Sequence, residues 1–434
     1  MTPRTLLFSL WALAVPCTAQ TVVPLDEALA TARSESLPVL RAAAQVEAAE
    51  ASLGAVRDGR WPALSLSLGG GQRYGLTFDQ TAGGLTQETV EAVDVGVSGS
   101  YVVFDGFERR AATRAAEATL RAAELNGVRA GQEAARTVLA GYLDVAEAEA
   151  RRAIAAANEE AERQLLAEVE AQVAFGTRPD YEVAQQTERV AAAEGAGLQA
   201  ERERERAAAR LVQILGLDAA RAYVFPLPEG PPAEAVPDPD AAVARALAAR
   251  PDLEAATAAQ RAVESDRRAA RAGRLPEVAI VGSVGTTFSS ANQAVGLPRQ
   301  LGDNRSGGVG LRVSLPLLDR GSTRARVRQA EARAATLGVE AETVRRTVVY
   351  EVTEAVSALR GLAAQARVAA ARRQAAEAAL DAELARFEAG TTTLQAVAQL
   401  RSRAVEARIE AERIRIQQRV QRRVLELALG AVPG

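Results

Sequence analysis

The most constraining feature of this sequence is an internal repeat, because its second half carries the landmark residues of the first half at a fixed offset. A period of 214 residues is far too long for a solenoid unit and indicates that a whole structural plan was duplicated. We predict a first structural repeat over residues 20–218, a Pro-rich linker over 219–238 and a second structural repeat over 239–434. The pairs at this offset are Pro62 and Pro276, Asp105 and Asp319, Gly176-Thr177 and Gly390-Thr391, Val183-Ala184-Gln185 and Val397-Ala398-Gln399, and Gly216 and Gly430; Pro38 and Pro251 are 213 residues apart.

The first residues have the pattern of a secretory signal. Arg4 precedes an apolar run from Leu6 to Val15, and small residues follow. Because this run is too short to span a bilayer, we predict a signal peptide at residues 1–19 and cleavage before Gln20. Lipidation of Cys17 is the alternative, and Pro16 fits it poorly because processing needs a small residue at that position. The mature chain is therefore predicted to be exported.

The residue inventory excludes most catalytic and metal chemistry. The chain has no histidine, and its single cysteine, Cys17, lies in the predicted signal peptide. Disulfides, imidazole ligands and histidine acid/base chemistry are thus excluded, and we predict no enzyme activity, no cofactor and no metal site. The 52 basic and 55 acidic residues are interspersed, so nucleic acid is not an expected partner.

Long helices dominate each repeat. An amphipathic start at residues 25–36 or 240–250 is interrupted by Pro38 or Pro251, so two short helices are expected end to end. Residues 106–175 and 321–389 contain no proline and little glycine, which predicts one helix of about 70 residues, roughly 100 Å long, in each repeat. Gly176 and Gly390 are suited to left-handed helix caps, after which a second long helix returns.

Between the short and long helices the period changes to two. Apolar residues alternate with Ser, Gly and Asp after Pro62 and again before Asp105, and the second repeat has the same pattern. This predicts four strands, two per repeat, with one apolar face. The residues that we expect to face lipid are Leu64, Leu66, Leu68, Val95, Val97, Ile280, Leu311 and Val313.

Four strands cannot close a membrane barrel by themselves, since single-chain barrels begin at eight. In lipid every strand edge must be paired, so several chains would have to contribute and the chain would form a symmetric oligomer. A soluble sandwich is the competing interpretation of the strands, and a coiled-coil strut is the competing interpretation of the helices.

Taken together, the order of elements, the duplication and the turn motifs resemble the TolC family of outer-membrane efflux proteins. The resemblance covers essentially the whole mature chain. It is carried by Leu25-Asp26-Glu27-Ala28-Leu29 with Leu37-Pro38, by the corners Val103-Phe104-Asp105-Gly106 and Leu317-Leu318-Asp319-Arg320-Gly321, and by the turns Phe175-Gly176-Thr177 and Ala389-Gly390-Thr391.

This resemblance implies a mainly α fold with a small membrane β part. The long α-helical hairpins would form a periplasmic α-barrel, and four strands per protomer would contribute to a twelve-stranded trimeric β-barrel in the bacterial outer membrane. The implied function is that of a passive exit duct for a tripartite efflux pump or a type I secretion system. The implied partners are two further copies of the chain, outer-membrane lipid, a periplasmic adaptor protein and an inner-membrane transporter.

The resemblance also places the two Gly-Thr turns at the periplasmic tip, where adaptors dock and the tunnel narrows. Well-known members carry acidic residues inside the second turn, whereas this chain has Ala396 and Gln399 at the matching positions. In the first repeat Glu182 is the remaining candidate for a ring of carboxylates at a gate, and a solvated charge on a helix face is the alternative. The tip residues are Gly176, Thr177, Arg178, Gly390, Thr391 and Thr392.

Two other classes of protein compete with the duct. A periplasmic coiled-coil adaptor would ordinarily have one long hairpin flanked by compact β-domains, whereas here hairpin, strands and short helices all occur twice. An exported enzyme would need a cluster of convergent polar groups, and the sequence shows none. The exported substrate is not specified by the sequence.

Overall fold

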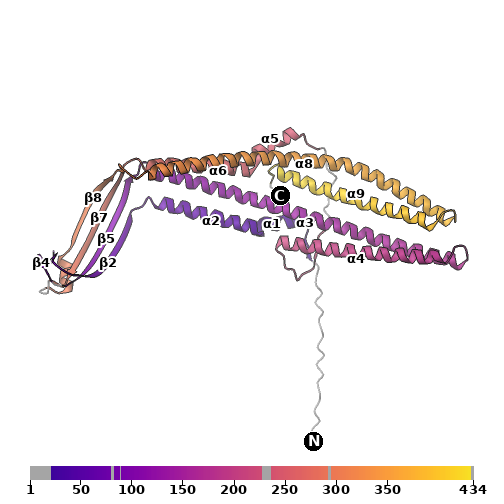
Figure 1. Ribbon diagram of the computed structural model, residues 1–434, viewed down its shortest axis with the longest axis horizontal. Helices are drawn as coiled ribbons and strands as arrows, with labels where there is room; N and C mark the ends of the chain where they lie inside the picture. Colours follow the sequence, from indigo (N-terminus) through magenta and orange to yellow (C-terminus); the bar gives the residue numbers. More distant parts are fainter. Residues whose placement is uncertain (1–20, 80–82, 88, 227–235, 292–294, 432–434) are drawn as a thin grey trace, which may run out of the picture. The chain divides into compact units, whose positions relative to one another are not determined.

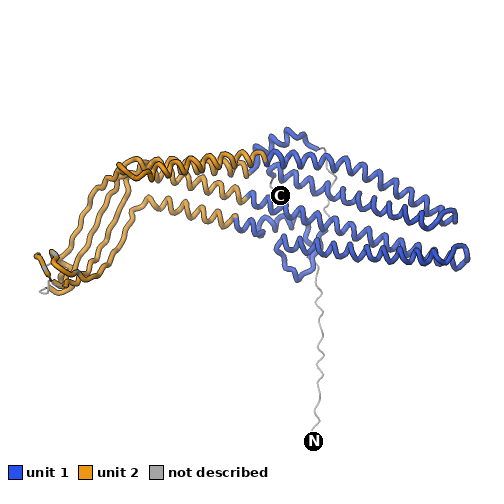
Figure 2. Tube along the Cα trace, in the orientation of Figure 1, with its two compact units in different colours: residues 1–41, 128–250, 347–434 blue, residues 42–127, 251–346 orange. Residues whose placement is uncertain are grey.

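A computed structural model describes residues 21–79, 83–87, 89–226, 236–291 and 295–431. The predicted signal peptide, including Cys17, lies outside these residues. The chain divides into two compact units, shown in Figure 2: unit 1 contains residues 1–41, 128–250 and 347–434, and unit 2 contains residues 42–127 and 251–346. Each unit combines segments of both sequence repeats, so the repeats are not separate globular bodies. In the part of the chain that the structure describes, no helix is long and apolar enough to cross a membrane.

The short helices occur in pairs, as predicted. Helices α1 (Leu25–Glu35) and α2 (Leu37–Asp58) are separated by Ser36, and α5 (Pro239–Ala249) and α6 (Pro251–Ala272) are separated by Arg250. Ser36 and Arg250 both have extended backbone angles. Arg250 directly precedes Pro251, which disfavours the helical region at that residue, and Ser36 lies two residues before Pro38. Proline is tolerated in the first turn of the following helix, where its missing N–H has no intrahelical partner.

The long helices have identical lengths in the two repeats. Helices α3 (Glu108–Ala174) and α8 (Ser322–Glu388) each contain 67 residues, and α4 (Tyr181–Leu215) and α9 (Leu394–Ala428) each contain 35. At 1.5 Å per residue α3 and α8 are each roughly 100 Å long. Within unit 1, Val348, Val352 and Val356 on α8 are buried and form an apolar stripe.

The four predicted strands form one antiparallel sheet in unit 2. Its order is β2 (Ala63–Arg73), β5 (Val90–Phe104), β7 (Glu277–Ser289) and β8 (Ser306–Ser314), which lie side by side in Figure 1. Leu66 lies opposite Val97 and Val97 lies opposite Val284, so the register places their side chains on one face. All eight residues predicted to face lipid share this face, whereas Ser65, Ser67, Asp94, Ser98, Ser283 and Gly310 lie on the other.

The expectation of only four strands was wrong. Two short pairs also form: β1 (Thr21–Val22) with β6 (Tyr223–Val224), in parallel, and β3 (Thr77–Asp79) with β4 (Gly84–Thr86). Pieces of two or three residues carry no alternation that could be recognised. A short helix, α7 (Leu297–Asp303), was also not predicted. It packs on β7, where the Gln300 side chain accepts from the Ser289 N–H (3.0 Å) and donates to the Ser289 carbonyl (3.1 Å), and so caps the strand where β8 no longer pairs with it.

The corners between sheet and long helices contain two consecutive residues with positive φ in each repeat. These are Gly106 (67°) and Phe107 (71°) after β5, and Arg320 (54°) and Gly321 (81°) after β8. The long helices therefore begin two residues and one residue, respectively, after the positions predicted. An aspartate precedes each pair: Asp105 accepts from the Arg109 N–H (3.0 Å) and Asp319 from the Thr323 N–H (2.7 Å). Hydrogen bonds from Thr323 and Gly321 hold the pKa of Asp319 at about 2.

The main apolar core of unit 1 surrounds Tyr142 of α3, together with Leu29, Leu139 and Leu211. The Tyr142 hydroxyl donates to the Pro226 carbonyl at 2.5 Å, and its ring packs edge-on against Phe225. Val23, just before α1, belongs to the same core, so the chain before α1 and the chain after α4 are both held to it.

Candidate functional site

The two hairpin turns of unit 1 have the same backbone geometry. Gly176 and Gly390 adopt φ of 71° and 70°, which is the left-handed conformation that favours glycine. The N–H of Thr177 donates to Gln172 O (3.0 Å) and that of Thr391 donates to Arg386 O (2.9 Å), which is the Schellman pattern that closes a helix. Each threonine hydroxyl donates to the carbonyl that its own N–H bonds: Thr177 to Gln172 O at 2.7 Å and Thr391 to Arg386 O at 3.0 Å. The Gly-Thr pairs thus terminate α3 and α8 in the same way.

Arg178 distinguishes the first turn from the second. Its guanidinium pairs with Glu182 at 3.0 Å, donates to the Phe387 carbonyl at 3.0 Å and lies 3.6 Å from the centre of the Phe387 ring. The Arg178 side chain is 9% exposed. This residue therefore holds the first hairpin to the second by a charge-assisted hydrogen bond and a cation–π contact. Thr392 stands at the matching position of the second turn, and its hydroxyl bonds Glu383 of its own hairpin.

The three candidate gate residues have different surroundings within one protomer. Glu182 is buried and its carboxylate is paired with Arg178. Gln399 is exposed, and Ala396 is half-buried in the first turn of α9, where its N–H donates to the N-cap hydroxyl of Thr393 (3.3 Å). The structure brings Glu182 and Arg178 together, and a carboxylate ring built from Glu182 stays a prediction.

A groove of about 410 Å³ lies between the two turns. It opens at the end of the hairpins, and both turns contribute to its walls. Among its lining residues, Arg178 and Phe387 form the contact that joins the hairpins, and Glu182 and Glu388 are acidic. The other lining residues are Gln172, Thr177, Pro179, Ala389 and Gly390.

A buried polar cluster below the turns was missed by the sequence reasoning. Gln186 of α4 donates to the Glu162 carboxylate at 2.6 Å, and Arg401 of α9 pairs with the same carboxylate at 3.3 Å and donates to the Ala161 carbonyl at 3.0 Å. All three side chains are buried. The signal in the sequence was weak, because each residue occupies one core position of a helix and resembles a surface residue until the partner helices are known.

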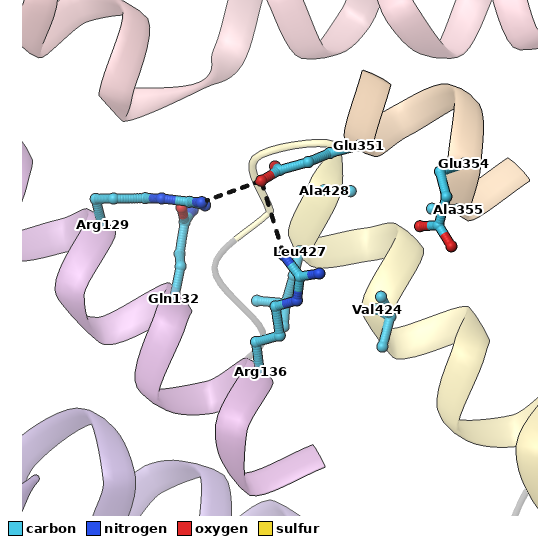
Figure 3. A pocket seen from close by; sticks show the side chains of 9 residues that line it. All are labelled: Arg129, Gln132, Arg136, Glu351, Glu354, Ala355, Val424, Leu427 and Ala428. Carbon is cyan, nitrogen blue, oxygen red and sulfur yellow. Dashed lines mark ion pairs between the residues drawn. The ribbon is translucent and has the colours of Figure 1, made fainter. Parts of the chain in front are cut away.

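A second charged cluster in unit 1 surrounds Glu351 of α8, as Figure 3 shows. Arg129 and Arg136 of α3 approach this carboxylate at 3.7 Å, and Arg250 pairs with it at 2.5 Å. The Arg250 side chain is 1% exposed. The adjoining cavity, of about 20 Å³, has room for little more than one water molecule. The cluster therefore links helices, and the cavity beside it is too small for a substrate.

The apolar face of the sheet in unit 2 is largely uncovered. Leu64, Leu66 and Leu68 are between 74% and 78% exposed, and Leu311 and Val313 are 67% and 62% exposed. Within the described residues β2 and β8 each pair with one strand of this sheet, so each leaves one edge of backbone groups without a strand partner. An exposed apolar face with two open edges is typical of a sheet that is completed elsewhere, and it disfavours the soluble sandwich.

Comparisons with known proteins agree with this geometry. The family model described as outer membrane efflux protein matches residues 28–217 and 242–431, two segments whose starts are 214 residues apart like the sequence landmarks. No curated protein sequence matches the chain. The structure is similar to the outer-membrane channel OprN, at 22% identity and a TM-score of 0.79, covering 94% of this chain and 90% of that one.

Two further solved structures are similar over nearly the whole chain. The outer membrane protein VceC of Vibrio cholerae has 20% identity and a TM-score of 0.78, with 94% of this chain and 96% of that chain covered. The outer membrane channel CmeC of Campylobacter jejuni has 18% identity and a TM-score of 0.79, with 94% and 85% covered. The predicted fold class and the resemblance stated above are thereby confirmed.

Proposed function

Because this chain belongs to the outer membrane efflux protein family and is an outer-membrane channel that extends into the periplasm, we propose that it is the passive exit duct of a tripartite efflux pump. One observation carries the proposal: a sheet with one uncovered apolar face and two open edges is joined to two helical hairpins of equal length. The sheet suits a pore through lipid, and the hairpins suit a tunnel that continues from it.

We propose that three copies complete the pore. Each copy contributes the four strands of its sheet, so three copies would give a twelve-stranded barrel in which β8 of one copy pairs with β2 of the next. The small polar face would then line a water-filled lumen, and the apolar face would contact lipid. Closure removes the open edges that hydrocarbon does not tolerate.

A cysteine scan tests this arrangement, since Cys17 is the chain's single cysteine and lies in the predicted signal peptide. Cysteines at Ser65 or Ser67 of β2 are combined with cysteines at Gly308 or Gly310 of β8, all four positions being on the polar face. Oxidation should give covalent trimers with at least one combination. If every combination gave only monomers without a disulfide between copies, closure between copies would be contradicted.

The hairpin turns would dock a periplasmic adaptor and the groove between them would form part of that contact. Support comes from the exposed positions of Phe175 and Tyr181 beside the first turn, which offer apolar surface for a partner. An inner-membrane transporter would then load the duct. Photo-crosslinking from Phe175, with Leu198 as an exposed control position farther along α4, should capture the adaptor from the first site and not from the second.

A type I secretion system is the second candidate function, since the same duct would serve a transporter that exports proteins. Deletion of the gene distinguishes the efflux function from the secretion function. Deletion should raise the accumulation of small molecules in the cell, and the wild-type gene should reverse it. Unchanged accumulation together with loss of a secreted protein would favour secretion, and recovery of the chain as a soluble periplasmic protein would favour the adaptor alternative.

A further inference from the structure

The sheet in unit 2 connects to helices α2, α3, α6 and α8 at one of its ends, opposite to the end at which α7 joins β7 to β8. β2 and β7 begin at the end with the four helices and β5 and β8 end there, because neighbouring strands are antiparallel. Helices α2, α3, α6 and α8 join the strands at this end, as Figure 1 shows. We define the helix-side rim as the ten residues that adjoin each strand on this side. These are residues 53–62, 105–114, 267–276 and 315–324.

The rim exposes large apolar side chains. Leu318 is 96% exposed, Leu317 85%, Trp61 77% and Phe107 63%. They lie in segments that directly adjoin the ends of β2, β5 and β8. Side chains of this size gain free energy by leaving water, so this surface fits an apolar partner. Tryptophan in particular is enriched where membrane proteins pass from hydrocarbon to water.

The same rim is strongly basic. Its four segments contain 11 arginines and 4 acidic residues, although the whole chain has a net charge of -3. Six of these arginines are exposed and have no acidic partner within the described residues; they are Arg60, Arg110, Arg114, Arg274, Arg320 and Arg324. Positive charge is therefore concentrated directly beside the apolar surface.

We propose that the helix-side rim binds anionic phospholipids of the membrane leaflet that faces the periplasm. The apolar side chains would lie at the level of the acyl chains and the arginines at the level of the headgroups, where the planar guanidinium bonds phosphate with two N–H groups. The proposal rests on the outer-membrane location and is independent of which substrate the duct carries.

A second copy of the chain would cover only part of this surface, because pairing of β8 with β2 of the next copy joins segments 315–324 and 53–62, whereas segments 105–114 and 267–276 adjoin the two central strands. In a symmetric assembly a neighbouring copy brings the same rim, which has the same excess of arginine. Arginines facing arginines repel, whereas phosphate groups neutralise them. The apolar residues alone would suit either partner, but the charge suits lipid.

The chain supplies its own probe, because it has two tryptophans and Trp11 lies in the predicted signal peptide. The purified channel is placed in phosphatidylcholine vesicles that contain a small, matched fraction of either brominated phosphatidylglycerol or brominated phosphatidylcholine. Bromine quenches tryptophan on contact. We expect the phosphatidylglycerol to quench Trp61 severalfold more strongly, and we expect this excess to vanish at about 1 M salt, where screening is nearly complete. A Trp61→Phe variant gives the background.

A charge-matched pair of variants tests the arginines. In the triple variant Arg110→Gln, Arg274→Gln and Arg324→Gln, both lipids should quench Trp61 equally. The control Arg202→Gln, Arg206→Gln and Arg403→Gln removes three exposed arginines of α4 and α9 and should keep the excess.

Equal quenching of the wild type by both lipids would overturn the proposal while leaving the rim in the membrane. Quenching by aqueous iodide and by neither lipid would place the rim in water and overturn the proposal as well. If the triple variant does not assemble, the salt dependence of the wild type still decides. Neither result alters the export assay of the duct.

Discussion

Placing arginine on the uncovered face of the sheet should prevent assembly of the channel. Leu66 lies within β2, opposite Val97, and is 74% exposed in one protomer, so a substitution there disturbs little packing within the protomer itself. Arginine on a lipid face costs on the order of 2–4 kcal/mol near the bilayer centre. Three copies would cost roughly 6–12 kcal/mol, which is comparable to the whole stability of an ordinary folded protein.

Ser67 is the matched control, because it is the next residue and its side chain lies on the other face. Its hydroxyl donates to the Gly96 carbonyl at 3.2 Å, and losing such an exposed bond costs about 1 kcal/mol or less. The assay is the amount of heat-resistant trimer in the outer-membrane fraction. Leu66→Arg should remove most of it and Ser67→Arg should leave most of it. Equal losses would refute the assignment of the apolar face to lipid.

Three further predictions follow from single residues. Arg320→Gly should raise the melting temperature, because glycine adopts the left-handed conformation of this position without strain, which stabilises the fold by about 0.5–1 kcal/mol. Arg324→Gly inside α8 should lower the melting temperature, because glycine destabilises a helix interior by a similar free energy, and two changes of the same sign would contradict the strain argument. Burial, aided by Asp26, raises the pKa of Tyr142 to about 12. The contribution of this group to stability should therefore be constant below pH 10 and fall between about pH 10 and 12, and Tyr142→Phe should abolish that fall in a pH series of melting curves. We expect trivalent cations added from the periplasmic side to block the channel only weakly in single-channel recordings, because Glu182 is the candidate ring carboxylate and is partly neutralised by Arg178. Glu182→Gln should remove this block, and tight block that persists in the variant would place the acidic entrance elsewhere.

Features that depend on a few neighbouring residues could be predicted from the sequence. Pro38 and Pro251 mark the breaks between short helices, since proline restricts its own backbone and that of the residue before it. Gly176 and Gly390 end long helices because the required conformation favours glycine. The alternation around Leu66 determines which side chains share a face of the sheet, whatever the strand pairs with.

The candidate site was predicted less completely, because residue type alone does not reveal a partner. Arg178 and Glu182 were both identified, but the cation–π contact of Arg178 with Phe387 joins residues 209 positions apart. The cluster of Glu162, Gln186 and Arg401 was missed for the same reason. Three polar residues on three helices acquire a common environment only when those helices pack.

Local physical chemistry thus determines the long helices, the paired short helices, the four strands of the main sheet, the Gly-Thr turns and the duplicated plan of this protein. Tertiary structure alone decided that β5 of the first repeat pairs with β7 of the second and that Thr21 pairs with Tyr223. It also decided that each compact unit is built from both repeats. These are contacts between residues far apart in the chain, and their free energy depends on packing and charge that no short window of sequence contains.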